Sequence, residues 1–237
     1  MIQQSKGKIF LAQDRGCDAT PSFLSMHLFN FGSYFNEHKT PFGNIDVIND
    51  DTLTGGSSME LKVEKDSYVI LIPMIGAVRY KDSRGNENLL AAGQWQLTKM
   101  VAGEKIEIQN PFKDTLVNFL QVWVKGDERL LLSLPLSSTY DVNSNINRLV
   151  PLSPSRFGDD LLPFKLSIGK FNGRADTTYA IDNNRTGVFL FVIEGAFEAN
   201  GRLLHPRDGL ALWNTEQVEM EALSNDAIIV VIETQIA

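Results

Sequence analysis

Hydrophobic residues along this chain occur in short runs and in strict alternation with polar residues, and both patterns are typical of β-strands. Residues 68–75 (YVILIPMI) are apolar, partly β-branched and interrupted by a proline, which favours a buried strand over a helix. Residues 104–108 (EKIEI) alternate between charged and apolar side chains, as in a strand with one buried face. Between them, Gly85 and Asn86 have the chemistry of a hairpin turn. Residues 59–110 are therefore predicted to form antiparallel strands around an apolar interior.

Further strands are predicted on both sides of this stretch. Residues 45–48 form a short strand, and residues 49–51 (NDD) close it, because Asn and Asp favour turns. Residues 116–124 (LVNFLQVWV) form a strong strand after the predicted hairpins.

The second half of the chain repeats the pattern of the first. Residues 188–197 (VFLFVIEGAF) match residues 69–78, and residues 228–232 (IIVVI) match residues 116–124. Two copies of an all-β unit of about a hundred residues predict two similar barrels in tandem. In a small barrel the inward side chains either fill a core or hold a ligand, so the inward residues are the ones that decide function.

Residues 126–164 are richer in Ser, Asn and Pro, and their periodicity is weak. They are predicted to connect an N-terminal domain of residues 1–130 to a C-terminal domain of residues 131–237 that includes the linker. A short helix over residues 127–132 (DERLLL) is the single helical element that the pattern allows.

The net charge of the protein makes some classes of binding partner unfavourable. The 237 residues include 22 Lys and Arg against 29 Asp and Glu, a formal net charge of −7. This excess disfavours non-specific binding to nucleic acid or to anionic membranes. No apolar run is long enough to span a bilayer, residues 1–6 do not resemble a signal peptide, and the single Cys17 cannot form an internal disulfide. We therefore expect a cytoplasmic protein that binds neither nucleic acid nor membranes.

Four stretches resemble the signatures of one family: residues 31–43 (FGSYFNEHKTPFG), residues 47–51 (VINDD), residues 76–86 with the hairpin DSRGN, and residues 208–213 (DGLALW). Together they resemble the pirin family of bicupins, and more specifically its bacterial pirin-like quercetinase branch. The resemblance covers nearly the whole chain. It implies an all-β fold of two tandem cupin barrels, which are jelly rolls or double-stranded β-helices.

The resemblance also implies a metal site, and this sequence departs from it. The family binds Fe or another divalent metal in the N-terminal cupin through a His-x-His pair and a later His-x-Glu pair. Without gaps, these positions fall on Lys62, Glu64, Ile106 and Ile108. A charged Lys is a poor ligand and Ile is none. We therefore expect the family fold with the metal ligands replaced, no cofactor, and a candidate ligand pocket at these four positions.

Two alternatives remain open at this point. A shift of one residue in the first strand would turn Leu61 and Val63 inward and give a plain apolar core, because successive side chains of a strand point to opposite faces. Alternatively, a non-standard donor set could hold Fe or another divalent metal. Its members would be Glu60, Glu64, Glu107 and His27.

The leading hypothesis for function is a non-catalytic module that binds an unknown small molecule or protein, with no catalytic residue assigned. The alternative is a metal-dependent, quercetinase-like dioxygenase that uses the non-standard donors. A third hypothesis, a regulatory protein partner, follows only from the resemblance to eukaryotic pirin.

Overall fold

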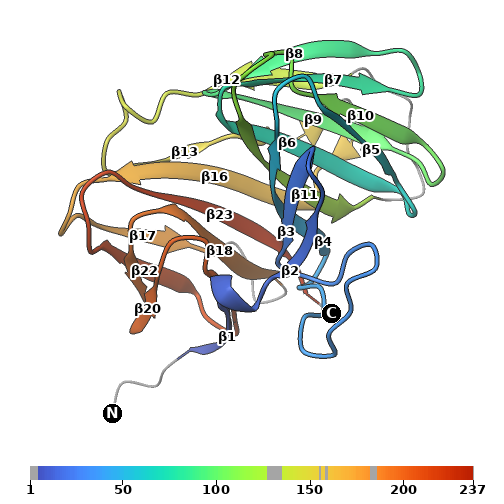
Figure 1. Cartoon of the computed structure of the whole chain (residues 1–237). Coiled ribbons are helices and arrows are strands. Elements are labelled where there is room, and N and C mark those ends of the chain that lie inside the picture. The colour runs from blue at the N-terminus through green and yellow to red at the C-terminus, as the bar shows by residue number, and fades with distance from the viewer. Residues whose placement is uncertain (1–4, 127–134, 155, 158–159, 182–185, 237) are drawn as a thin grey trace. The chain divides into compact units, whose positions relative to one another are not determined.

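The computed structural model describes residues 5–126, 135–154, 156–157, 160–181 and 186–236. These residues form strands joined by turns, with one short 3-10 helix at Ala12–Asp14 (Figure 1). The chain divides into two compact units. The N-terminal unit comprises Gly16–Pro41 and Ile45–Tyr140, and the C-terminal unit comprises Met1–Arg15, Phe42–Asn44 and Asp141–Ala237. Among the described residues no helix is long and apolar enough to cross a membrane.

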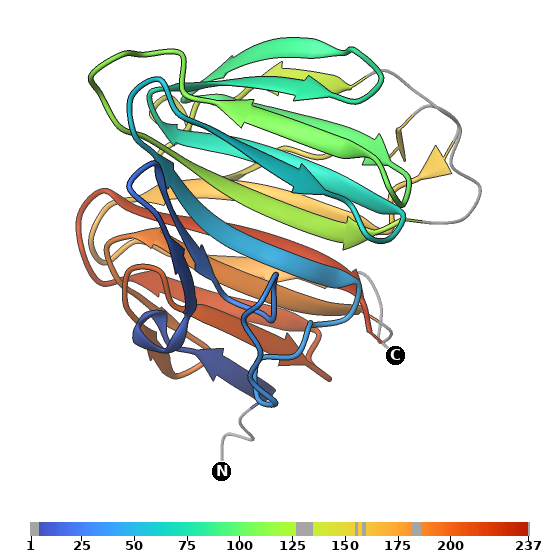
Figure 2. The same cartoon turned by 45° about the vertical axis from the view of Figure 1, so that its right-hand side comes forward.

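The described part of the N-terminal unit contains two sheets, of seven and four strands (Figure 2). The first has the order β12-β9-β6-β11-β4-β3-β2 and the second β5-β10-β7-β8. The strands are β2 Gly16–Ala19, β3 Phe23–His27, β4 Ile45–Leu53, β5 Ser58–Lys62, β6 Ser67–Ile75, β7 Ala77–Asp82, β8 Glu87–Ala91, β9 Gln94–Met100, β10 Lys105–Gln109, β11 Val117–Lys125 and β12 Leu136–Thr139. One apolar core draws side chains from both sheets, as expected for a cupin-like barrel.

The described part of the C-terminal unit repeats this plan with a six-stranded sheet, β1-β21-β18-β23-β16-β13, and a four-stranded sheet, β17-β22-β19-β20. A two-stranded ribbon, β14-β15, completes it. The strands are β1 Lys6–Phe10, β13 Arg148–Pro151, β14 Arg156–Phe157, β15 Asp160–Leu161, β16 Phe164–Phe171, β17 Asp176–Ala180, β18 Thr186–Glu194, β19 Phe197–Ala199, β20 Arg202–Leu204, β21 Gly209–Trp213, β22 Gln217–Ala222 and β23 Ala227–Gln235. The predicted all-β fold with two tandem cupin barrels is confirmed.

The first strand of the chain pairs with the second unit. β1 is antiparallel to β21, with Lys6 opposite Trp213 and Phe10 opposite Gly209. Phe42 also belongs there, because its ring lies 6.0 Å from that of Phe189. Residues 1–15 and 42–44 thus group with the C-terminal unit, although the sequence pattern places them in the first domain. The predicted boundary at residue 130 and the short helix over 127–132 lie outside the described residues.

One strand is longer than its sequence predicts. β4 does not close at residues 49–51 but continues to Leu53, paired with β3 on one side and β11 on the other. The turn preference of Asn and Asp is outweighed here by ladder hydrogen bonds on both edges of the strand. This extension carries polar side chains into the interior of the N-terminal unit.

Candidate functional site

The β5–β10 wall of the N-terminal unit is apolar on its inner side. The β-ladder places Leu61 opposite Ile106 and Met59 opposite Ile108. These four side chains and Val63 are buried members of the same core cluster. The inner face of this wall therefore contains only carbon and one thioether sulfur as side-chain atoms.

The predicted pocket is not formed by this arrangement. Ile106 and Ile108 point inward as expected, but Lys62, the last residue of β5, and Glu64, two residues beyond it, are exposed. The sequence-based register is thus off by one residue on the first strand. The physical reason is that water solvates a charged Lys or Glu far better than an apolar core does.

This wall does not fit the metal that the family binds. Fe and similar divalent ions need imidazole, carboxylate or water ligands, and the inward residues here are aliphatic apart from one methionine. The non-standard donor set is not assembled either. Glu60 is exposed and pairs with Lys105 at 2.7 Å, and Glu107 is exposed on the same outer face. His27 lies on a strand of the other sheet. Across the described ranges no group of three or more His, Cys, Asp or Glu is arranged to hold a metal ion.

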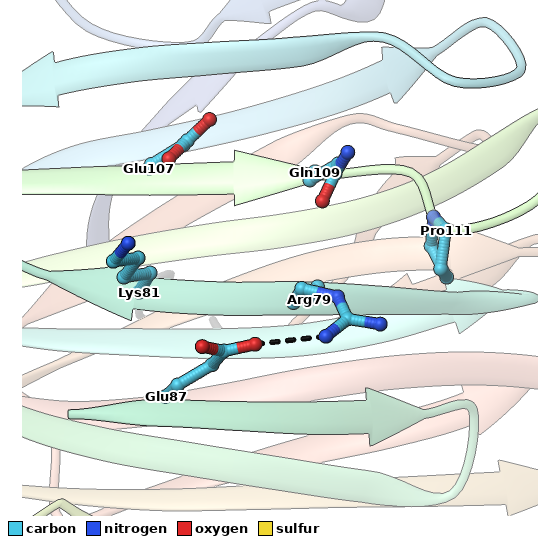
Figure 3. A pocket seen from close by; sticks show the side chains of 6 residues that line it. All are labelled: Arg79, Lys81, Glu87, Glu107, Gln109 and Pro111. Atoms are coloured by element: carbon cyan, nitrogen blue, oxygen red, sulfur yellow. Dashed lines mark hydrogen bonds and ion pairs between the residues drawn. The ribbon is translucent and has the colours of Figure 1, made fainter. Parts of the chain in front are cut away.

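A hollow of about 330 Å³ lies on the outer side of the four-stranded sheet (Figure 3). Its lining residues are Arg79, Lys81, Glu87, Glu107, Gln109 and Pro111. Arg79 donates to Glu87 at 2.8 Å, and Lys81 lies opposite Glu107 in the β-ladder. Because each cation faces an anion and exposed ion pairs contribute little, this hollow has the character of a solvated sheet face.

The opposite wall of the N-terminal unit is polar. Five side chains from three adjacent strands share its inner face, and we call them the inner polar layer: Ser25, His27, Asn49, Asp51 and Gln121. All five are buried. Asn49 has His27 opposite it on one side and Gln121 on the other, and directly opposite residues of an antiparallel pair point the same way. The layer therefore faces the same interior as Val47 and Leu53, which alternate with it on β4.

A continuous chain of hydrogen bonds runs through the layer. Asp18, whose side chain is 40% exposed, contacts His27 Nε2 at 3.1 Å, and His27 Nδ1 lies 3.4 Å from Ser25 Oγ. The Ser25 hydroxyl donates to Asp51 Oδ1, and Gln121 Nε2 donates to Asp51 Oδ2. Trp123 Nε1 donates to Gln121 Oε1 at 3.1 Å. The chain thus links a solvent-facing carboxylate to a fully buried one.

The donors and acceptors of these side chains allow two arrangements of the protons along the hydrogen-bond chain. If Asp51 is ionised, Ser25 uses its single proton on Asp51, so both ring nitrogens of His27 must donate. If Asp51 is protonated, it donates to Ser25, Ser25 donates to Nδ1, and a neutral His27 donates from Nε2 to Asp18. The two arrangements differ only in the position of protons between His27 and Asp51.

Burial favours the arrangement in which Asp51 is protonated. Desolvation raises the pKa of Asp51 from 3.8 to about 7, although the hydrogen bonds from Ser25 and Gln121 act in the opposite direction. The nearby Asp50 raises the pKa of Asp51 slightly further. Well below pH 7 the buried carboxyl is therefore neutral.

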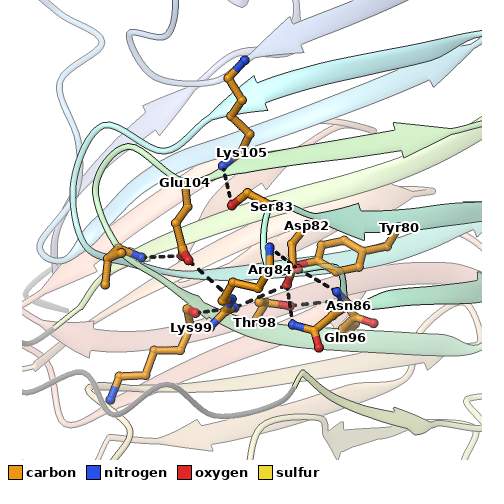
Figure 4. A network of polar contacts seen from close by, with 11 residues as sticks. Tyr80, Asp82, Ser83, Arg84, Asn86, Gln96, Thr98, Lys99, Glu104 and Lys105 are labelled. Atoms are coloured by element: carbon orange, nitrogen blue, oxygen red, sulfur yellow. Dashed lines mark hydrogen bonds and ion pairs between the residues drawn. The ribbon is translucent and has the colours of Figure 1, made fainter.

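The hairpin between β7 and β8 is held by a second polar network (Figure 4). Asp82 Oδ1 accepts the backbone N–H groups of Arg84 and Asn86 at 3.0 and 2.9 Å. Asp82 Oδ2 accepts the Asn86 amide at 2.8 Å and the Tyr80 hydroxyl at 3.1 Å. Burial alone would raise the pKa of Asp82, but these hydrogen bonds and the charge of Arg84 lower it overall. The family-like DSRGN hairpin is therefore a structural turn.

Replacing Asp82 by Ala is expected to lower the free energy of unfolding by about 2–4 kcal/mol, because several buried donors lose their acceptor. The matched control is Asp141→Ala. Asp141 also accepts two backbone N–H groups, at 2.9 and 3.0 Å, but in an exposed turn. Urea denaturation of both variants checks this prediction, and an equal loss in the two would contradict the structural role of the buried network.

Sequence reasoning found only one member of the inner polar layer, His27, and assigned it to a different donor set. Asn49 and Asp51 are part of the VINDD signature and of a predicted turn, but the sequence assigns them no site. It assigns no role to Ser25 or Gln121. The available signal was their spacing: two polar residues two positions apart in a strand that continues to Leu53 must share one face.

Comparisons with known proteins agree with the fold and with the sequence signatures. Residues 11–124 match the family described as Pirin, and residues 164–233 match the Quercetinase C-terminal cupin domain. The quercetin 2,3-dioxygenase of Escherichia coli K12 is 24% identical over 207 residues, covering 86% of this chain and 89% of that protein. The putative quercetin 2,3-dioxygenase PA1210 of Pseudomonas aeruginosa is 26% identical over 213 residues, covering 86% and 90%.

The solved structures give the same result. YhhW from Escherichia coli superimposes with a TM-score of 0.86 at 21% identity, covering 98% of this chain and 99% of that one. The nickel(II) complex of bacterial pirin YhhW gives 0.85 at 22% identity, covering 98% and 100%. The N-terminal half of the chain thus matches the Pirin domain, and the C-terminal half matches the quercetinase C-terminal cupin domain. The chain belongs to the pirin family of bicupin proteins.

Proposed function

We propose that this protein is a pirin-like bicupin whose N-terminal unit has lost the family's metal donors and acts as a non-catalytic module that binds a small molecule or a protein. One observation carries the proposal. The inner face of the β5–β10 wall consists of Met59, Leu61, Val63, Ile106 and Ile108. None of these side chains supplies the nitrogen or oxygen that a catalytic divalent metal requires.

The proposal keeps the expectation of no nucleic-acid or membrane partners, which rests on the acidic net charge of −7. It also keeps the cytoplasmic location that the single Cys17 favours. The second candidate is a quercetinase-like dioxygenase with unusual donors. It is supported by the names of the curated relatives and by the nickel(II) complex of YhhW.

Metal analysis and a turnover assay separate the two candidates. Protein purified without chelators is expected to hold Fe, Mn, Ni, Cu and Zn only at substoichiometric levels. Quercetin with added Fe(II) is expected to show no dioxygen uptake above the enzyme-free rate, whereas the Escherichia coli relative named quercetin 2,3-dioxygenase serves as the positive control. Stoichiometric metal together with dioxygen uptake that disappears in Glu64→Ala or Glu107→Gln would establish the dioxygenase instead.

A further inference from the structure

Asn49 is the unsatisfied member of the inner polar layer. Its side chain is 1% exposed, and neither its Nδ2 nor its Oδ1 has a hydrogen-bond partner among the described residues. Buried amides are nearly always paired, because an unpaired one loses its hydration and gains nothing in return. An amide that is unpaired at both ends, in the middle of a polar layer, therefore offers a donor and an acceptor to a partner molecule.

Every other side-chain polar atom of the layer has at least one hydrogen-bond partner. Gln121 uses its amide nitrogen on Asp51 and its oxygen on Trp123. Asp51 accepts at both oxygens, and both ring nitrogens of His27 have partners. A molecule seated on Asn49 thus meets one N–H donor group and one carbonyl acceptor, side by side. It must present an acceptor and a donor in return.

The surroundings of the layer exclude a charged molecule. The ring of Phe31 lies 5.0 Å from that of His27 and 5.8 Å, edge-on, from that of Trp123. Tyr34 packs directly on Gly16, so that a Cβ at this glycine would meet the Tyr34 ring at 2.3 Å. Aromatic rings therefore lie beside the polar layer along its β2 and β3 edge. In such an environment an ion without a counter-ion is strongly disfavoured, whereas a flat, neutral polar group is accepted.

We propose that the inner polar layer is a binding site for a small uncharged molecule carrying a hydrogen-bond donor and acceptor on neighbouring atoms, as in a primary carboxamide, seated on Asn49 between His27 and Gln121. The site lies on the wall opposite the positions of the family's metal ligands. At the edge strand β2, the Asp18 side chain that contacts His27 is 40% exposed. The inference deepens the proposed function, on which it rests, by naming the site and the class of ligand.

Acetamide is the probe that tests the site, with N,N-dimethylacetamide as its counterpart that lacks the N–H donor. In side-chain amide NMR spectra of the full chain, acetamide is expected to cause saturable shifts of the Asn49 and Gln121 signals. Binding of N,N-dimethylacetamide is expected to be about tenfold weaker, as the loss of one hydrogen bond implies.

Two variants make the result specific. Asn49→Leu has nearly the same shape and removes the unpaired polar atoms, so its melting temperature is expected to be unchanged or higher. The acetamide-induced shift of the remaining Gln121 signal is expected to vanish in this variant. Gln109→Leu removes the one amide that lines the outer hollow and is expected to leave the response unchanged.

The absence of any saturable shift in the wild-type protein, or an equal response in Asn49→Leu, would overturn the inference and leave ordinary internal water as the partner of Asn49. The proposed function would stand in that case, because metal content and quercetin turnover test it separately. Stoichiometric metal would instead refute the proposed function, whatever the acetamide result.

Discussion

Replacing Asp51 by Asn is expected to stabilise the folded protein at neutral and alkaline pH. Folding raises the pKa of this carboxyl from 3.8 to about 7, so the folded state binds its proton more tightly than the unfolded state does. Stability therefore falls as the pH rises from about 4 to about 7, and the penalty is complete above that range, at about 4 kcal/mol as an upper bound. Asn has no carboxyl to ionise, and its amide can donate to Ser25 as protonated Asp51 does.

Urea denaturation between pH 4 and pH 9 measures this effect. The wild-type free energy of unfolding is expected to decline across the acidic half of this range, relative to Asp51→Asn, and the two curves should separate most above pH 7. Glu107→Gln, at an exposed position of the outer sheet face, is the control and should keep the wild-type slope. A constant difference between wild type and Asp51→Asn at every pH would show that the carboxyl does not titrate in the folded protein.

Restoring the family's ligands is expected to create a metal site only on the inward face. The first variant combines Leu61→His, Val63→His, Ile106→His and Ile108→Glu, whose positions all belong to one buried core cluster. The second follows the ungapped sequence register and keeps the two β10 changes, but places its histidines at Lys62 and Glu64, which are exposed. Only the first can direct four donors into one interior.

The expected difference between the variants is large. The second variant buries a new imidazole and carboxylate on β10 without partners, at a cost of several kcal/mol, roughly, and should unfold more easily without taking up metal. The first variant loses more stability as an apoprotein, because it buries two further imidazoles, but it should regain stability by binding about one Zn(II) per chain, since metal binds the folded state selectively. Equilibrium dialysis and melting curves with and without Zn(II) check this. Uptake by the second variant alone would contradict the observed register.

The fold could be predicted from the sequence because its signals are local and repeated. Alternation in residues 104–108 and the apolar run of residues 68–75 each specify strands, and their recurrence in the second half specifies two barrels. The register of β5 shows the limit of a family comparison. An ungapped match to the family's His-x-His pair places Lys62 inward. The alternation of Met59, Leu61 and Val63 instead places apolar side chains there, and the desolvation cost of a charge favours this second register.

The inner polar layer could not be predicted in the same way. Its members come from β3, β4 and β11, which are far apart in sequence and meet only through strand order and register. Asn49 and Asp51 also carry a strong local preference for turns, which hid the continuation of β4. Non-local pairing outweighs such local preferences, and one sequence contains no direct record of it.

The pairing of β1 with β21 has a consequence for biosynthesis. β1 is synthesised before its partner β21, which is completed roughly two hundred residues later, so the loop-closure entropy of this pairing is among the largest in the chain. Two further hydrogen bonds hold the ends of this segment. Arg202 donates to the Ser5 carbonyl at 2.6 Å, and the Ala12 N–H donates to Asp208 at 2.7 Å. Both can form only after Arg202 and Asp208 have been synthesised. Until then β21 presents an open edge, to which the matching segment of another nascent copy could add. On a polysome, therefore, the β1 segment of one nascent chain can pair with β21 of a neighbouring chain.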